Sequence, residues 1–210
     1  MRSFWGRLPI LLLFSLSLVG CARPAAWQQS YVLRAPASMG GSARPPGKPA
    51  GVLRLAPVLA PNWLMSTDYV YRLDYADPEA LLPYPKVRWA ATPGQMLSNL
   101  LLQCLREQEA WQAVLSADQS GRPDLLLQLN LQRFQLDYST PDAGQAEIQA
   151  TATLVQNGSF RVLAQQEFQS RVPLRQMGPA GGAAAMSTAA QELTGRVAQW
   201  AAQKSRVPVS

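Results

Sequence analysis

The chain has 210 residues, 48% of them hydrophobic, and a formal net charge of +6, which fits one folded domain with a short extension. It contains no histidine, which excludes Ser-His-Asp and Cys-His nucleophiles, the commonest general base and nearly all zinc sites. Its 19 Lys and Arg residues are scattered singly, whereas a nucleic-acid surface normally clusters them. We therefore expect no enzyme, no metal or other cofactor and no nucleic-acid partner.

The first 20 residues have the pattern of a bacterial lipoprotein signal peptide. Arg2 and Arg7 form a positively charged n-region. The apolar segment Leu8–Val19 that follows is shorter than the roughly 20 residues that a membrane-spanning helix needs. The sequence LVGC that ends at Cys21 resembles the lipobox, in which a diacylglycerol is attached to the cysteine thiol before cleavage. We predict that residues 1–20 are removed and that Cys21 is lipidated. The alternative is a plain signal peptide with a chance cysteine.

Lipidation of Cys21 would make residues 21–30 a lipidated tether for a folded domain over 31–206. Several acyl chains on one cysteine, palmitate among them, give stable anchoring, whereas a single chain binds membranes only marginally. The residue after the cysteine is Ala22 and not Asp, which by similarity to Gram-negative lipoproteins indicates the outer membrane. We therefore expect a lipid-anchored protein on the periplasmic face of the outer membrane.

The first half of the domain is predicted to form short strands separated by loops. Strands are predicted at 31–33, 52–58 and 69–75, from their β-branched and aromatic content. The Pro/Gly-rich stretch 35–50 can form neither a paired β-strand nor a helix, so we predict a flexible loop there. The proline-containing stretch 77–85 is predicted to be a turn that leads to Val87-Arg88-Trp89.

A helix start follows at Thr92. Thr92 is placed as the N-cap, Pro93 as the first helical residue and Gln95 as the N3 residue, which is a capping-box arrangement. Apolar residues then recur at helical spacing to about Glu109. Cys104 lies on that apolar face, so we predict a buried thiol in the core and not a redox centre.

The second half predicts four strands and a closing helix. The strands are placed at 111–115, 124–138, 145–156 and 160–172, and the helix at 184–204. A change of phase near Gln132 suggests a β-bulge, and Asn157-Gly158 is a strong hairpin turn. Gly178–Gly182 is predicted to be a loop before the helix, whose apolar stripe is Met186, Ala189, Ala190, Leu193, Val197 and Trp200.

The predicted order is three strands, a helix, four strands and a helix. Two amphipathic helices laid on one face of a mainly antiparallel sheet would bury both apolar stripes. The predicted fold class is therefore a two-layer α+β domain.

The stretch Asn62-Trp63-Leu64-Met65 is the candidate contact surface. An apolar cluster in a loop is typical of an interface, and Trp is enriched among residues that dominate binding energy. We therefore assign partner binding to Trp63, Leu64 and Met65, and the alternative is that Trp63 folds back to cap the sheet. Trp89, just before the helix, is predicted to belong to the core.

The order of several short motifs resembles that of a known family. After the lipobox come YVL at Tyr31, a strand ending in proline, the Asn62-Trp63-Leu64 loop, YVYR from Tyr69, Arg88-Trp89 before the capped helix, and a Leu-x-Leu-x-Leu strand. This order resembles the ABC-type transport auxiliary lipoproteins, the PqiC-like family, over essentially the whole mature chain. The insertion at 35–50 departs from the family pattern.

The resemblance implies an accessory role. Members of the family accompany an inner-membrane transporter and a periplasm-spanning MCE-domain protein that move lipids or other hydrophobic molecules between membranes, and the lipoprotein would be the docking module at the outer membrane. The alternative function is a structural lipoprotein that assists the assembly or integrity of an outer-membrane complex. Whether the chain forms a homo-oligomer is left open.

Overall fold

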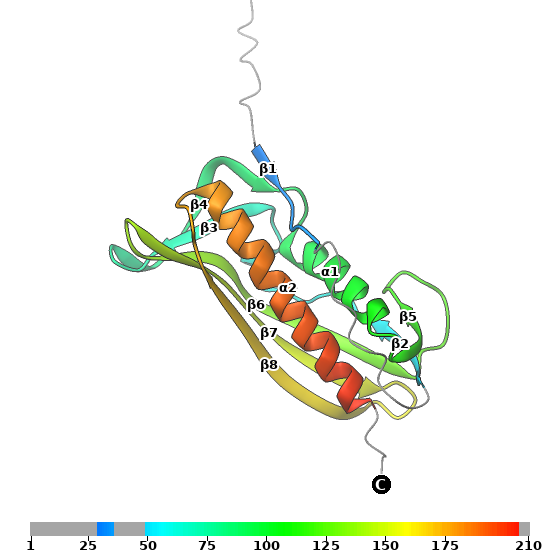
Figure 1. Cartoon of the computed structure of the whole chain (residues 1–210). Coiled ribbons are helices and arrows are strands. Elements are labelled where there is room, and N and C mark those ends of the chain that lie inside the picture. The colour runs from blue at the N-terminus through cyan, green and yellow to red at the C-terminus, as the bar shows by residue number, and fades with distance from the viewer. Residues whose placement is uncertain (1–28, 36–48, 206–210) are drawn as a thin grey trace, which may run out of the picture.

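A computed structural model describes residues 29–35 and 49–205 of the chain. The predicted signal peptide, Cys21 and most of the predicted loop 35–50 lie outside the described residues. Within them, two helices lie side by side on one face of a curved sheet (Figure 1). The predicted two-layer α+β class is confirmed.

The residues that the structure describes form one eight-stranded sheet, two α-helices and a short 3-10 helix. The strands are β1 (Gln29–Tyr31), β2 (Ala50–Leu55), β3 (Asp68–Leu73), β4 (Asp77–Trp89), β5 (Trp111–Leu115), β6 (Leu125–Thr140), β7 (Ala143–Gln156) and β8 (Arg161–Pro173). The helices are η1 (Asn62–Leu64), α1 (Pro93–Glu107) and α2 (Pro179–Lys204).

The long strand β6 organises the sheet. One of its edges pairs antiparallel with β7, which pairs in turn with β8. Its other edge pairs in parallel with β2 over Leu125–Leu127 and with β3 over Leu136–Tyr138. β5 continues the sheet beyond β2, and β4 and β1 continue it beyond β3. Most residue pairs of the sheet are antiparallel, but β2 and β3 pair in parallel with β6. The sequence pattern did not predict this parallel pairing.

Helix α1 begins as predicted. The Thr92 hydroxyl accepts from the Gln95 amide at 3.4 Å, and the Gln95 side chain accepts from the Thr92 amide at 3.3 Å. The buried thiol of Cys104 donates to the Thr194 hydroxyl of α2 at 3.4 Å, and burial raises the pKa of the thiol. The predicted core position of Cys104 is confirmed.

The core lies between the helices and the inner face of the sheet. Every residue of the predicted α2 stripe is buried, and α2 packs on β7 and β8 and beside α1. The inner face of β7 carries three alanines without solvent exposure, Ala146, Ala150 and Ala152. Such small side chains let the backbone of α2 lie close to β7.

The predicted turn at 77–85 is wrong, because these residues form most of strand β4. Only the end of β4, Val87–Trp89, pairs with β1, so most of the strand has a neighbour on one side alone. On such an edge, a proline whose missing N–H faces outward removes no ladder hydrogen bond. The ladder with β3 is also irregular, with two shifts of register.

The predicted glycine loop 178–182 is also wrong, because α2 begins at Pro179 and includes Gly181 and Gly182. A Cβ at Gly182 would lie 2.3 Å from Leu136 Cδ1 and 2.5 Å from the Tyr69 hydroxyl oxygen. The glycine therefore permits close packing of α2 on the sheet, and its role is not to break the helix.

The β6–β7–β8 hairpins follow the predicted pattern with small shifts. The β6 ladder loses register between Leu131 and Arg133, which confirms the bulge at Gln132. The hairpin turn at Asn157-Gly158 extends through Phe160, which was assigned to the strand. Phe160 has a φ of 54° and is 79% exposed.

Candidate docking surface

The segment that leads to the candidate residues runs beside β6, between the parts of β6 that pair with β2 and with β3. The Leu59 amide donates to the Leu129 carbonyl at 2.9 Å, and the Leu131 amide donates to the Leu59 carbonyl at 2.8 Å. The 3-10 helix η1 then follows Pro61. The backbone of the segment is therefore held against β6 before η1 begins.

In the single turn of η1, neighbouring side chains point in opposite directions, one into the core and the others to solvent. Leu64 is buried with 3% exposure, whereas Trp63 and Met65 are 60% and 64% exposed. The alternative in which Trp63 folds back onto the sheet is therefore wrong. Of the three predicted contact residues, Leu64 belongs to the core and holds η1 in place, and only Trp63 and Met65 face outward.

Leu59 is a further exposed residue, and the sequence pattern did not single it out. Its side chain is 64% exposed although its backbone pairs with β6. Pro57 and Pro61 flank it, and this was the available signal, because prolines argue against a continuous inner strand. We call Leu59, Trp63 and Met65 the η1 surface.

Buried aromatic rings fix the segment that follows η1. The Trp89 amide of β4 donates to the Thr67 carbonyl at 2.8 Å. Trp89 is 1% exposed, and its ring centroid lies 4.4 Å from that of Tyr69 and 5.4 Å from that of Phe134. The predicted core position of Trp89 is confirmed, and Trp89 joins the η1 segment to the core.

The η1 surface lies toward the end of the domain at which the described chain begins. Strand β1 pairs with the end of β4, with Tyr31 opposite Trp89, and that end of β4 bonds to Thr67. Two strand spacings, or about 10 Å, therefore separate β1 from the segment after η1.

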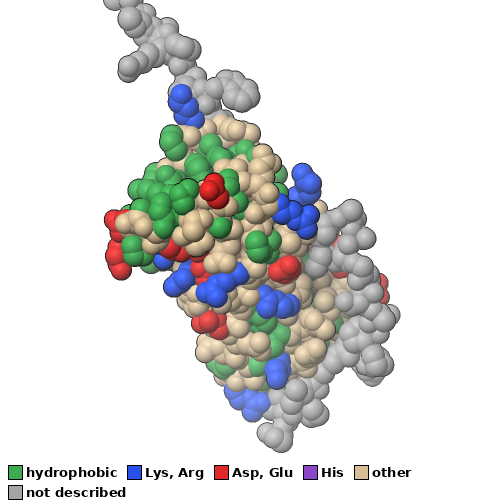
Figure 2. Space-filling model, turned by 60° about the vertical axis from the view of Figure 1, so that its left-hand side comes forward, with side chains coloured by type: hydrophobic (Ala, Val, Ile, Leu, Met, Phe, Trp, Pro, Cys, Tyr) green, Lys and Arg blue, Asp and Glu red, His purple; other side chains and the backbone are tan. Residues whose placement is uncertain are grey.

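On the face shown in Figure 2, the charged side chains of the described residues are interspersed and do not gather in a single patch. Figure 2 shows hydrophobic side chains gathered toward one end of the visible face, with Lys, Arg, Asp and Glu side chains interspersed over the rest. Ser66 and Asp68, just after η1, bond to each other, with the serine hydroxyl donating to Asp68 Oδ2 at 2.8 Å. The η1 surface therefore offers apolar contact area beside locally satisfied polar groups.

Comparison with known proteins identifies the chain. The family model described as the ABC-type transport auxiliary lipoprotein component matches residues 31–198. The chain belongs to this family. The family to which the sequence motifs pointed is thereby confirmed. The description of the family is that of a transport component and not that of an enzyme.

Solved structures share the fold of this auxiliary lipoprotein. A Xanthomonas campestris protein of the DUF330 family has a TM-score of 0.70 at 22% identity, covering 84% of this chain and 94% of its own. An uncharacterised protein has a TM-score of 0.64 at 16% identity, with coverages of 82% and 97%. A hypothetical protein from Chlamydia trachomatis has a TM-score of 0.51 at 8% identity, with coverages of 75% and 99%. No curated protein matches the chain.

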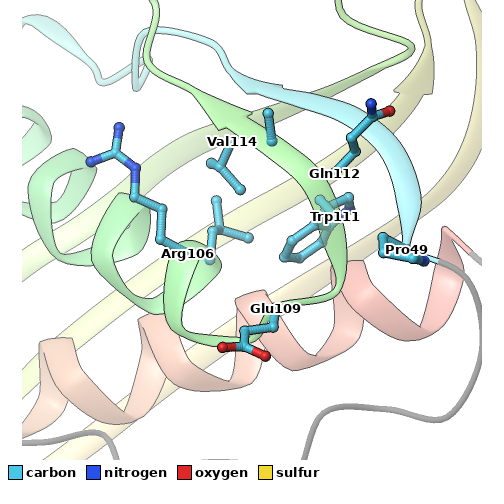
Figure 3. A pocket seen from close by; sticks show the side chains of 8 residues that line it. Pro49, Arg106, Glu109, Trp111, Gln112 and Val114 are labelled. Carbon is cyan, nitrogen blue, oxygen red and sulfur yellow. The ribbon is translucent and has the colours of Figure 1, made fainter.

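Two clefts in the described part of the auxiliary lipoprotein are lined by residues outside the η1 surface. One of about 540 Å³ lies between the end of α1 and β5, where Arg106 and Glu109 flank Trp111 and Val114 (Figure 3). The other, of about 770 Å³, lies between the β1 segment and α2, and small residues such as Ala183 line it. Neither lining brings together two carboxylates, or a nucleophile and a base, as general acid–base or covalent catalysis requires.

Among the helices of 29–35 and 49–205, none combines the length and apolarity that crossing a bilayer requires.

Proposed function

We propose that this auxiliary lipoprotein is anchored through Cys21 in the inner leaflet of the outer membrane and docks a periplasm-spanning MCE-domain protein there. In this role the lipid tether supplies location and the α+β domain supplies recognition. The family supports the transport role, and the lipobox sequence at Cys21 supports the anchor. The transported molecule would be a lipid or another hydrophobic compound handled by the MCE protein and its inner-membrane partners.

The observation that carries the proposal is the exposure of Trp63 and Met65 on a fixed segment. Large apolar side chains that face solvent mark contact sites when the backbone beneath them is ordered, and Trp is enriched among residues that dominate binding energy. Here Leu64 and the Thr67–Trp89 hydrogen bond hold the segment. Little ordering is then needed on binding, which lowers the entropic cost of association.

The alternative function is a structural lipoprotein that assists assembly of an outer-membrane complex. Both functions use an anchored domain with an apolar contact, so the identity of the partner separates them. Affinity purification of the full-length lipidated chain after chemical crosslinking should recover an MCE-domain protein. Recovery of an outer-membrane β-barrel without an MCE-domain protein would favour assembly.

Trp63→Ala should weaken co-purification of the MCE partner, by about 2 kcal/mol if Trp63 is a dominant contact. The fold should be retained, because the side chain is 60% exposed, and circular dichroism checks this. Phe160→Ala is the matched control, since Phe160 is a more exposed aromatic residue in the β7–β8 turn. Equal recovery of the MCE partner with both variants would show that the docking surface lies elsewhere on the domain.

A further inference from the structure

The sheet face opposite the helices carries a buried group of charges on four strands. Glu147 of β7 and Asp137 of β6 are 2% and 5% exposed. The charged groups around them are arginines, Arg72 from β3, Arg133 from β6 and Arg171 from β8. Two carboxyl groups thus lie beneath three guanidinium groups on a face that is otherwise mainly Gln, Thr and Asn.

Glu147 is the member of this group that holds its negative charge. Its Oε1 accepts from Arg171 Nη2 at 3.1 Å and from Gln169 Nε2 at 2.5 Å, and its Oε2 accepts from Arg133 Nη1 at 3.3 Å. Burial alone would raise the pKa of Glu147, but hydrogen bonds from Asp137 and Gln169 and the two arginines lower it overall. The ordered donors therefore fix an ionised carboxylate at this position.

Asp137 lies diagonally across the β6–β7 ladder from Glu147, because Glu147 pairs with Gln135 and Asp137 pairs with Gln145. It has few donors of its own. Gln135 Nε2 donates to Asp137 Oδ1 at 2.6 Å, and the nearest cation, Arg72 Nε, is 3.9 Å from the same oxygen. Burial, followed by its hydrogen bond with Glu147, raises the pKa of Asp137 to about 6. An ionised Asp137 would set a second buried negative charge against Glu147, with only the longer contact to Arg72 in compensation.

We infer that Asp137 and Glu147 share one proton and form a pH-sensitive joint between β6 and β7, with Arg72 of β3 as the reserve counter-ion. With the proton present, Asp137 donates to Glu147 and joins the two strands. When the proton leaves to solvent, the two carboxylates repel each other and Asp137 depends on Arg72. The joint therefore weakens as pH rises through the range in which Asp137 titrates.

The sign of the effect on stability follows from the raised pKa. Unfolded Asp titrates near 3.9, so the unfolded chain loses this proton at lower pH than the folded chain does. The stabilisation by Asp137 is thus complete below about pH 4 and is lost as pH rises through about 6. The lowered pKa of Glu147 has the opposite effect on stability, mainly below its ordinary value of 4.5. Between pH 5 and 7.5 the contribution of Asp137 is therefore the larger of the two.

The test is a carbon-13 NMR titration of the Asp carboxyl groups in the unlipidated chain, together with melting curves at pH 5 and pH 7.5. Asp137 should titrate near pH 6, and wild-type Tm should fall by about 5 °C between the two pH values. Arg72→Gln should move the Asp137 midpoint upward, because it removes the reserve counter-ion.

Asp137→Asn keeps the hydrogen bond to Glu147 without a titrating proton, so it should abolish the Tm difference. Asp142→Asn, at an exposed position in the β6–β7 turn, is the matched control and should retain the difference. A wild-type Asp137 midpoint at or below pH 4 would overturn the inference, and this measurement stands even if a variant fails to fold. An unchanged Asp137 midpoint in Arg72→Gln would contradict the role of Arg72 as a counter-ion of Asp137.

Discussion

Replacing Leu101 with alanine should lower the free energy of unfolding by about 2–5 kcal/mol, the range for large-to-small changes in a packed core. Leu101 has no solvent exposure and lies in the cluster between α1, α2 and the sheet. Its removal takes away apolar burial and leaves a cavity that a helix held at both ends cannot close. Urea denaturation followed by circular dichroism measures the change.

The control for this core variant is Asn99→Ala on the exposed side of the same helix. Exposed substitutions of this kind change stability by about 0.5 kcal/mol or less, so Asn99→Ala should stay close to wild type. A loss below 1 kcal/mol for Leu101→Ala would contradict the packing of α1 described above.

Replacing Cys21 with serine should move the protein from the membrane fraction to the soluble fraction. Serine lacks the thiol that accepts the diacylglycerol, and no second anchor is expected. Fractionation followed by immunoblotting measures the change. In wild-type cells, globomycin, which blocks the lipoprotein signal peptidase, should make the precursor accumulate. Recovery of Cys21→Ser with the outer membrane would show that the anchor lies elsewhere.

Local signals account for the features that the sequence predicted well. The capping box at Thr92 and Gln95 involves atoms three residues apart, so its pattern was readable without the fold. The alternation along β6 and its change of phase at Gln132 were readable for the same reason, because side chains of a strand alternate between two faces. The α2 stripe follows from helical periodicity alone.

Features that depend on distant contacts were not predictable. Gly181 and Gly182 look like a loop, and only the approach of Leu136 and Tyr69 explains why a helix carries them. The prolines of β4 argue against a strand until it is known that β1 pairs only with its end and leaves the rest of that edge open. The parallel pairing of β2 and β3 with β6 leaves no local pattern, because residues far apart in the chain set its register.

The candidate site was predictable only in part. The sequence singled out residues 63–65 as apolar and placed them in a loop, but it could not show that η1 buries Leu64 and exposes its neighbours. The pair formed by Asp137 and Glu147 was not predictable either. The bulge at Gln132 determines which face of β6 carries Asp137, and the hairpin register places it diagonal to Glu147. Neither residue stands out in the sequence.

Direct binding between the purified unlipidated chain and the purified MCE-domain protein tests the docking proposal most directly. The mature chain carrying Cys21→Ser should bind without acyl chains, because the domain supplies recognition. Its affinity should change little between low and high salt, since exposed ion pairs contribute little and are screened. Calorimetry of the two proteins, with Trp63→Ala alongside, gives the measurement. Binding that is weakened by Trp63→Ala is the predicted result, and no binding by the wild-type chain would contradict docking and favour the assembly role.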